Sequence, residues 1–235
     1  PMSVCHAQAF VTKNRVYLVG GQTTSGNWIN NIYTAPINAD GTLGAWVSSG
    51  TIPASLGESS IFVTKNTVYL LGGGNTNGYS LNVYRASINS DGIIGSWVSG
   101  TTLPAEIGIS PIVITKNRLY LLGGAGPFGG TNIIYSAPIL EGLNDYSSYY
   151  AEDIVNYCYP RSGKPWQQQY QINETQSGDI TGWTVGTSLP FNICGHGYIV
   201  TKNRVYLIGG WNGDVNSAVS TVYTAPINAD GTLGT

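Results

Sequence analysis

Few side chains in this sequence are suited to catalysis or metal binding. The chain contains two histidines, His6 and His196, and three cysteines, Cys5, Cys158 and Cys194. The cysteines lack the spacing of a metal site, and the sequence contains neither a glycine-rich phosphate loop nor a serine-nucleophile motif. The sequence therefore predicts no cofactor, no metal site and no enzymatic activity.

The thiols allow one internal disulfide at most. Cys5 and Cys194 stand at equivalent positions, the fourth after Pro1 and after Pro190. A Cys5–Cys194 bond, a bond between Cys158 and Cys194, and unpaired thiols are three open alternatives, because connectivity depends on distances that a sequence does not define.

Acidic turns are the second candidate for chemistry. Asp-Gly pairs occur at residues 40–41, 91–92 and 230–231. Each pair supplies one carboxylate, whereas calcium takes about six to eight oxygen ligands. These pairs are instead typical of tight hairpin turns, so we expect structural turns and no calcium site.

Aromatic rings beside amides and carboxylates indicate ligand binding. They occur in four segments of differing sequence, at 22–31, 75–81, 125–132 and 211–219. Rings can stack on a sugar or peptide while neighbouring amides form hydrogen bonds to it. The candidate ligand-binding residues are Trp28, Asn30, Tyr79, Phe128, Trp211, Asn212 and Asp214. The alternative is that these segments differ because nothing constrains them.

Composition narrows the class of protein and of partner. Of the 235 residues only 9% are charged, while Gly reaches 32, Tyr 16 and Trp 6, a content that favours short strands and tight turns. The net charge of −2 argues against nucleic acid as a partner, and no apolar run is long enough for membrane insertion. Low charge with abundant Asn, Ser, Thr and Tyr favours an extracellular, cell-surface or virion location.

Four copies of one segment run through the chain. The copies begin at residues 11, 63, 114 and 200, and the first reads Val-Thr-Lys-Asn-Arg-Val-Tyr-Leu-Val-Gly-Gly. The first two intervals between copies are 52 and 51 residues, and a regular spacing of about 50 residues is the signature of repeat architectures. The wider last interval indicates an insertion of about 35 residues, at 139–176.

Each copy predicts four short strands. In the second copy an apolar first strand at 59–64 leads through a Thr-Lys-Asn turn to a second strand ended by Gly-Gly. A third strand at 82–88 leads through an Asp-Gly hairpin to a fourth strand that contains Trp97, as Trp46 and Trp183 do in their copies. One such sheet cannot bury both faces, so we expect the sheets to stack.

The Leu/Ile-Pro start, the Gly-Gly pair, the third-strand Tyr and the spaced Trp resemble Kelch repeats. The resemblance implies an all-β fold, a β-propeller of Kelch-like four-stranded blades forming one domain over 1–235. The blades are about 1–50, 51–101, 102–187 with insertion 139–176, and 188–235, which lacks its outer strand. Either the four close a small ring, or further blades lie outside this chain or on another chain.

Kelch-like propellers include oxidases, lectins and protein adaptors, so the resemblance leaves the function open. Copper oxidases among them use two His, two Tyr and a Tyr–Cys crosslink. Here His6 and His196 are one register apart relative to the prolines, so we expect both to be structural. The Asp40 segment also differs from the Ser-x-Asp-x-Gly-x-x-Trp box of sialidase propellers. Here Gly41 follows Asp40 directly, and Trp46 comes six residues after Asp40.

The insertion is rich in aromatic residues, and we expect it to form a contact surface for a ligand, a subunit or the flank of the domain. Its candidate contact residues are Tyr149, Tyr150, Tyr159 and Trp166. The sequence predicts a binding module for a glycan or protein ligand. An assembly role in a surface or fibre complex, as a homo-oligomer, is the alternative, and a Kelch-type oxidase or glycan-active enzyme comes third.

Overall fold

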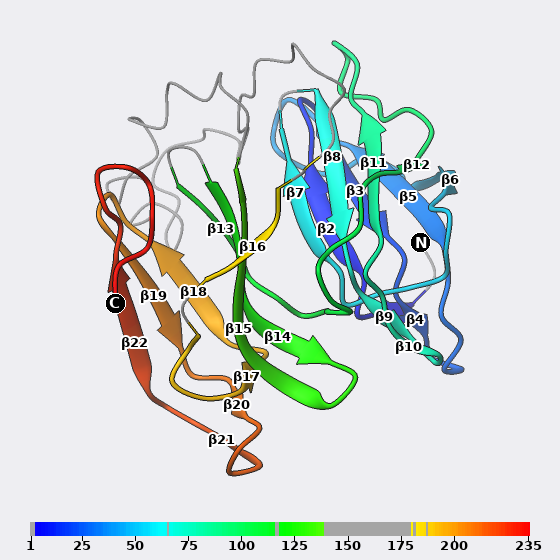
Figure 1. The fold of residues 1–235 in the computed structure, drawn as a ribbon. Helices are drawn as coiled ribbons and strands as arrows, with labels where there is room; N and C mark the ends of the chain where they lie inside the picture. Colours follow the sequence, from blue (N-terminus) through cyan, green and yellow to red (C-terminus); the bar gives the residue numbers. More distant parts are fainter. Residues whose placement is uncertain (1–2, 65, 116–117, 139–179, 181, 187) are drawn as a thin grey trace. The chain divides into compact units, whose positions relative to one another are not determined.

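A computed structural model describes residues 3–64, 66–115, 118–138, 180, 182–186 and 188–235 of the chain (Figure 1). Every element among these residues is a strand and none is a helix, which confirms the all-β prediction. The chain divides into two compact units. Unit 1 contains the described residues up to Gly108, and unit 2 contains those from Ile109 onward.

Unit 1 contains two antiparallel four-stranded sheets, one for each of the first two copies. The first has the order β2 (Gln8–Val11), β3 (Arg15–Val19), β5 (Asn31–Pro36) and β6 (Val47–Thr51). The second has the order β7 (Ser60–Val63), β8 (Thr67–Leu71), β11 (Val83–Ser87) and β12 (Val98–Ser99). Two short hairpins complete the unit, β1 (Val4–Cys5) with β4 (Gln22–Thr23) and β9 (Gly74–Asn75) with β10 (Gly78–Tyr79).

The two sheets of unit 1 pack face to face. Phe10, Tyr17 and Val19 from one sheet share a buried core with Val68 and Leu70 from the other. Residues two apart on a strand point to the same side, which places Tyr17 and Val19 of β3 on one face and Val68 and Leu70 of β8 on the other.

A hydrogen-bonded joint locks this packing. The hydroxyls of Thr12 and Tyr17 in the first copy donate to the backbone oxygen of Gly92 in the second, at 2.7 and 3.1 Å. Gly92 lies in the Asp-Gly hairpin, so the turn of one copy is anchored on the strands of the other.

Unit 2 contains one larger and one smaller sheet. The larger includes β13 (Ile112–Ile114), β14 (Arg118–Gly126), β15 (Gly129–Pro138), β16 (Thr184–Val185), β17 (Ile193–Cys194), β20 (Trp211–Asn212) and β21 (Ser217–Ala218). The smaller has the order β18 (Gly197–Val200), β19 (Arg204–Ile208) and β22 (Val222–Pro226).

The same joint recurs in unit 2. Thr115 and Tyr120 donate to the backbone oxygen of Gly231 at 2.7 and 3.0 Å. Apolar residues of the third and fourth copies, such as Leu122 and Leu207, pack together behind it. Thr, Tyr and Gly stand at the same places in the copies of both units, so one pair of sequence motifs builds both joints.

One detail of the strand prediction is wrong. Trp46, Trp97 and Trp183 each lie just before the fourth strand rather than within it, since the strands begin at Val47, Val98 and Thr184. Trp97 is 9% exposed and belongs to the core of unit 1. The chain pairs with β11 from the next residue, Val98, onward. The insertion at 139–176 lies outside the described residues.

Candidate functional site

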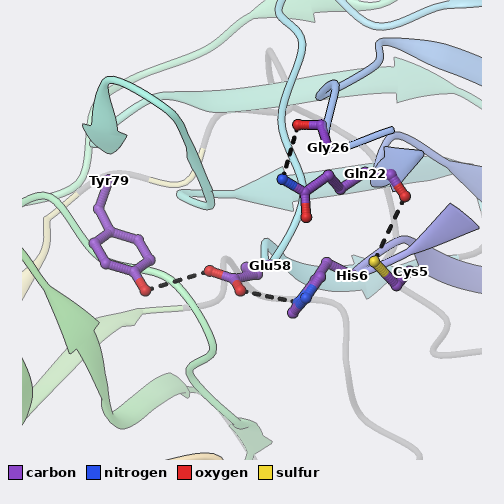
Figure 2. Close-up of polar contacts among 6 residues, drawn as sticks. All are labelled: Cys5, His6, Gln22, Gly26, Glu58 and Tyr79. Atoms are coloured by element: carbon purple, nitrogen blue, oxygen red, sulfur yellow. Dashed lines mark hydrogen bonds and ion pairs between the residues drawn. The ribbon is translucent and has the colours of Figure 1, made fainter. Parts of the chain in front are cut away.

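A polar cluster gathers at one end of unit 1, where β1, β4 and β10 meet the loop before β7 (Figures 1 and 2). Its centre is a pair between His6 and Glu58, whose Nδ1 and Oε1 atoms are 2.9 Å apart. The His6 side chain is 47% exposed and that of Glu58 17%, so the pair faces solvent on the histidine side.

The backbone explains why these two residues meet. His6 and Glu58 occupy the same position in consecutive copies, and both have left-handed φ values, 55° and 57°. The Glu58 N–H donates to the His6 carbonyl at 2.9 Å, which brings the two positions together. A left-handed non-glycine residue costs about 1–2 kcal/mol, so the surrounding structure must hold both residues in place.

Tyr79 on β10 joins the cluster. Its hydroxyl donates to Glu58 Oε2 at 3.3 Å, from the side opposite His6 (Figure 2). The ring lies over Gly108, where an added Cβ would be 2.8 Å from ring carbon Cδ1. The absence of a side chain at Gly108 therefore makes room for the ring.

Trp28 has the corresponding place one copy earlier. Its ring lies over Gly57, where an added Cβ would be 2.7 Å from Cζ3. The indole and the His6 imidazole have centroids 5.9 Å apart at a tilt of 48°. An aromatic ring thus lies beside the histidine imidazole.

A short network holds the loop beside the histidine. Cys5 Sγ donates to the Gln22 carbonyl at 3.5 Å, and Gln22 Nε2 donates to the Gly26 carbonyl at 2.9 Å (Figure 2). Cys5 also pairs with Gln22 in the β1–β4 ladder. These contacts fix the segment that leads to Trp28.

This arrangement can present a directed acceptor beside an apolar surface. With Glu58 accepting from Nδ1–H, neutral His6 has its proton on Nδ1 and its lone pair on Nε2. Nε2 can accept a hydrogen bond from a ligand hydroxyl, while Trp28 offers a ring for stacking. Both are features that a polyhydroxylated ligand uses.

Three other candidate residues form hydrogen bonds with other residues of their own unit. Asn30 Nδ2 donates to the Ile52 carbonyl at 3.3 Å. In unit 2, Asn212 Oδ1 accepts from the Asp214 N–H at 2.8 Å, and the Asp214 carboxylate accepts from Asn192 at 2.6 Å. These contacts shape the loops, and ligand contact by these residues stays a prediction.

The aromatic candidates of unit 2 lie apart from polar groups of this kind. Phe128, at the tip of the β14–β15 hairpin, is 103% exposed, and Trp211 on β20 is 46% exposed. At the positions equivalent to His6 and Glu58, unit 2 has Ile109 and Gly195, whose φ values are 54° and 61°. The backbone is conserved between the units, but the pair of ionisable side chains is confined to unit 1.

The buried histidine of unit 2 differs from His6. His196 is 8% exposed, and burial lowers its pKa below the ordinary 6.5, an effect that the Leu122 backbone partly offsets. Neither ring nitrogen makes a hydrogen bond of ordinary geometry to a described residue. His196 is thus a buried imidazole whose pKa is lowered by burial, and its structural role stays a prediction.

The remaining predicted residues are only partly described. Cys5 is an exposed free thiol in unit 1, and its pairing with Cys194 of unit 2 stays a prediction. Cys194 is half-buried on β17. Cys158, Tyr149, Tyr150, Tyr159 and Trp166 lie outside the described residues, and their proposed roles stay predictions.

The Asp-Gly turns are engaged internally. Asp40 Oδ1 accepts from the Thr42 hydroxyl at 2.7 Å and from the Thr42 N–H at 3.0 Å, and these bonds lower the pKa of Asp40. Asp230 and Thr232 repeat the arrangement. No group of three or more His, Cys, Asp or Glu that could hold a metal occurs among the described residues.

Sequence reasoning missed Glu58 and assigned His6 a structural role. The signal was the alignment of the copies, which places His6 and Glu58 in one column beside the Gly57 and Cys5 positions.

Among the described residues no helix has both the length and the apolarity to cross a membrane. No protein-family model matches the chain, and no curated protein matches it.

Proposed function

We propose that this chain is a Kelch-like propeller that works as a binding module, and that the loop end of unit 1 holds a carbohydrate ligand. The observation that carries the proposal is the combination of Trp28, with its ring beside His6, and the Glu58 carboxylate that orients the His6 imidazole. A sugar presents an apolar C–H face and a rim of hydroxyls, which match a ring and a fixed acceptor.

The positions of the polar groups support binding rather than bond cleavage. Both Glu58 oxygens are engaged, one by His6 and the other by Tyr79. A glycosidase generally needs two carboxyl groups flanking the scissile bond, and the cluster supplies one. Low charge and abundant hydroxyl and amide residues favour an extracellular or virion surface as its location.

A glycan array followed by calorimetry tests the proposal. We expect saturable binding to at least one glycan, and Trp28→Ala should weaken the affinity about tenfold or more by removing the stacking ring. Tyr79→Phe keeps the ring over Gly108 but removes the bond to Glu58, so a loss of only a few-fold is expected.

Phe128→Ala is the matched control, because Phe128 is a fully exposed aromatic residue in unit 2. It should leave the affinity unchanged. Equal affinities of the wild type and Trp28→Ala, or an array on which nothing binds, would contradict the proposal. Thermal melts of each variant separate loss of binding from loss of folding.

A further inference from the structure

Each joint in the two units consists of a hairpin and a socket. The hairpin is the Asp-Gly turn with the apolar residue that follows it, and the socket is the sheet face around the Thr and Tyr donors of a preceding copy. Inside unit 1 the hairpin of the second copy occupies the socket of the first, and inside unit 2 the hairpin of the fourth copy occupies the socket of the third.

One hairpin in the described chain is not docked in a socket. The first copy contains Ile37-Asn38-Ala39-Asp40-Gly41-Thr42-Leu43-Gly44, which is identical in sequence to residues 227–234 of the docked hairpin in unit 2. Its internal hydrogen bonds are the same as well, including Asn38 Nδ2 to Thr42 Oγ1 at 2.9 Å and Asn228 Nδ2 to Thr232 Oγ1 at 2.9 Å. It is therefore preformed for docking.

Exposure separates this hairpin from the docked ones. Gly41 is exposed, whereas Gly92 and Gly231 are buried. Leu43 is 46% exposed, whereas its counterpart Ile94 is 9% exposed. The first-copy hairpin thus leaves a glycine carbonyl and an apolar side chain in solvent.

Among the described residues, the socket of the fourth copy is likewise uncovered. Residues 200–207 of the fourth copy are identical to residues 11–18, which form the occupied socket of unit 1. Ile199, Ile208 and Val222 are 39%, 39% and 55% exposed. The matching residues of the first copy are buried. Phe10, which pairs with Tyr17, is 6% exposed, and the paired residues Val19 and Ile32 are 2% and 1% exposed.

The donors of the two sockets differ in the same way. Thr115, which holds Gly231 at 2.7 Å, is 3.4 Å from the Arg118 carbonyl of its own turn. Thr201 has no docked hairpin among the described residues, and its hydroxyl donates to the Arg204 carbonyl at 3.1 Å instead. Thr64 of the second copy bonds within its own turn in the same way, to the Thr67 carbonyl at 3.0 Å.

We propose that the fourth-copy socket of one chain binds the first-copy hairpin of a second copy of this chain. Thr201 and Tyr206 donate to the partner's Gly41 carbonyl, and Leu43 of that partner enters the apolar sheet face to which Ile208 and Val222 belong. Each half has the sequence of a half that is engaged inside a unit: the hairpin matches the one docked in unit 2, and residues 200–207 match the socket occupied in unit 1. The contact is heterologous, with different surfaces on the two chains.

Complementation between two variants tests this proposal. Leu43→Asp breaks the hairpin half and Ile208→Asp breaks the socket half, because each buries a carboxylate in the contact. Both residues are exposed in the isolated chain, so folding should be retained. We expect the wild type to self-associate in sedimentation and light-scattering measurements, and each variant alone to associate at least about tenfold more weakly.

An equal mixture of the two variants should form a dimer, because the intact socket of one matches the intact hairpin of the other. Val215→Asp, at a 63% exposed site in the β20–β21 loop, is the control and should associate like the wild type. A wild type that is monomeric at all concentrations, or a mixture that stays monomeric, would overturn the proposal. Glycan binding by unit 1 can persist in either case, so the two proposals fail separately.

Discussion

The two units share a frame but differ in what stands on it. Both contain the joint in which a Thr and a Tyr hydroxyl hold a glycine carbonyl, and both have left-handed residues at the equivalent loop position. Unit 1 has His6 and Glu58 there, joined as a pair, whereas unit 2 has Ile109 and Gly195. The strained backbone therefore belongs to the scaffold, and only its side chains make the candidate site.

The loop aromatics show the same difference. Trp28 and Tyr79 of unit 1 each lie over a glycine of the next copy. In unit 2 the residue at the glycine position is Cys194, and Phe128 of the preceding copy is fully exposed. Where the following copy has glycine at this position, the aromatic ring of the loop packs over it and is held in place.

The largest effect is expected where the copies approach each other most closely. An added Cβ at Gly20 would overlap the backbone oxygen of Leu56 in the next copy, and the residue has a φ of 63°. Gly209 has almost the same φ, 62°, but the nearest atom to its added Cβ among the described residues would be the Val219 oxygen, at 3.2 Å. Gly20→Ala should cost about 3 kcal/mol of unfolding free energy, and Gly209→Ala about 1 kcal/mol.

Urea unfolding followed by fluorescence measures both losses. Gly26→Ala controls for the dihedral cost within unit 1, since its φ is 84° and nothing lies within 4 Å of the added atom. Equal losses for Gly20→Ala and Gly26→Ala would show that the close approach to Leu56 does not matter.

The joints come next in size. Tyr17→Phe and Tyr120→Phe each remove one hydroxyl from a glycine carbonyl that a Thr still holds, so each should cost about 1 kcal/mol. Burial raises the pKa of Tyr120, so its hydroxyl remains a donor at neutral pH.

Tyr206→Phe is the matched control, because the Tyr206 hydroxyl makes no hydrogen bond to a described residue. It should be close to neutral in dilute solution. Denaturation midpoints for the three variants test the comparison, and a loss for Tyr206→Phe as large as the other two would show that the hydroxyls do not act through the joints.

The smallest effect is expected for the pH dependence of stability that His196 causes. The pKa of His196 is lowered by burial, so the unfolded chain binds a proton more readily than the folded one. The stability associated with this residue is fully present above the ordinary pKa of 6.5 and is lost as the pH falls from there towards the lower pKa of the folded state. His196→Phe keeps a ring of similar size and should flatten this dependence.

The unfolding free energy is measured at intervals between about pH 8 and about pH 5, the range in which histidines titrate. A slope in His196→Phe that equals the wild-type slope would assign the pH dependence to other groups.

The sequence allowed much of the fold to be predicted because its signals are local. Asp-Gly pairs and the Val-Tyr-Leu runs predicted the hairpins and the strands, and the edges agree within a residue for 59–64 and 82–88. Trp97 was misplaced because strand propensity says nothing about where an indole leaves the sheet edge to enter the core.

The site was harder to predict because it depends on contacts between copies. His6 and Glu58 come from different copies and meet only when the two sheets stack. Trp28 and Tyr79 were found from their residue type and loop position, but not the glycines beneath them. Periodicity identifies equivalent positions, whereas the register between stacked sheets decides which of them touch.

The acceptor in both joints is a main-chain oxygen, and this has a consequence for how such a chain can change over time. A carbonyl is present whatever side chain a turn carries, and the hairpins already differ, with Ala39 against Ser90 and Thr42 against Ile93. Copies joined in this way are interchangeable parts. Gene duplication or loss can lengthen or shorten the array without requiring a matching mutation at the new boundary, while the loops remain free to acquire new ligands.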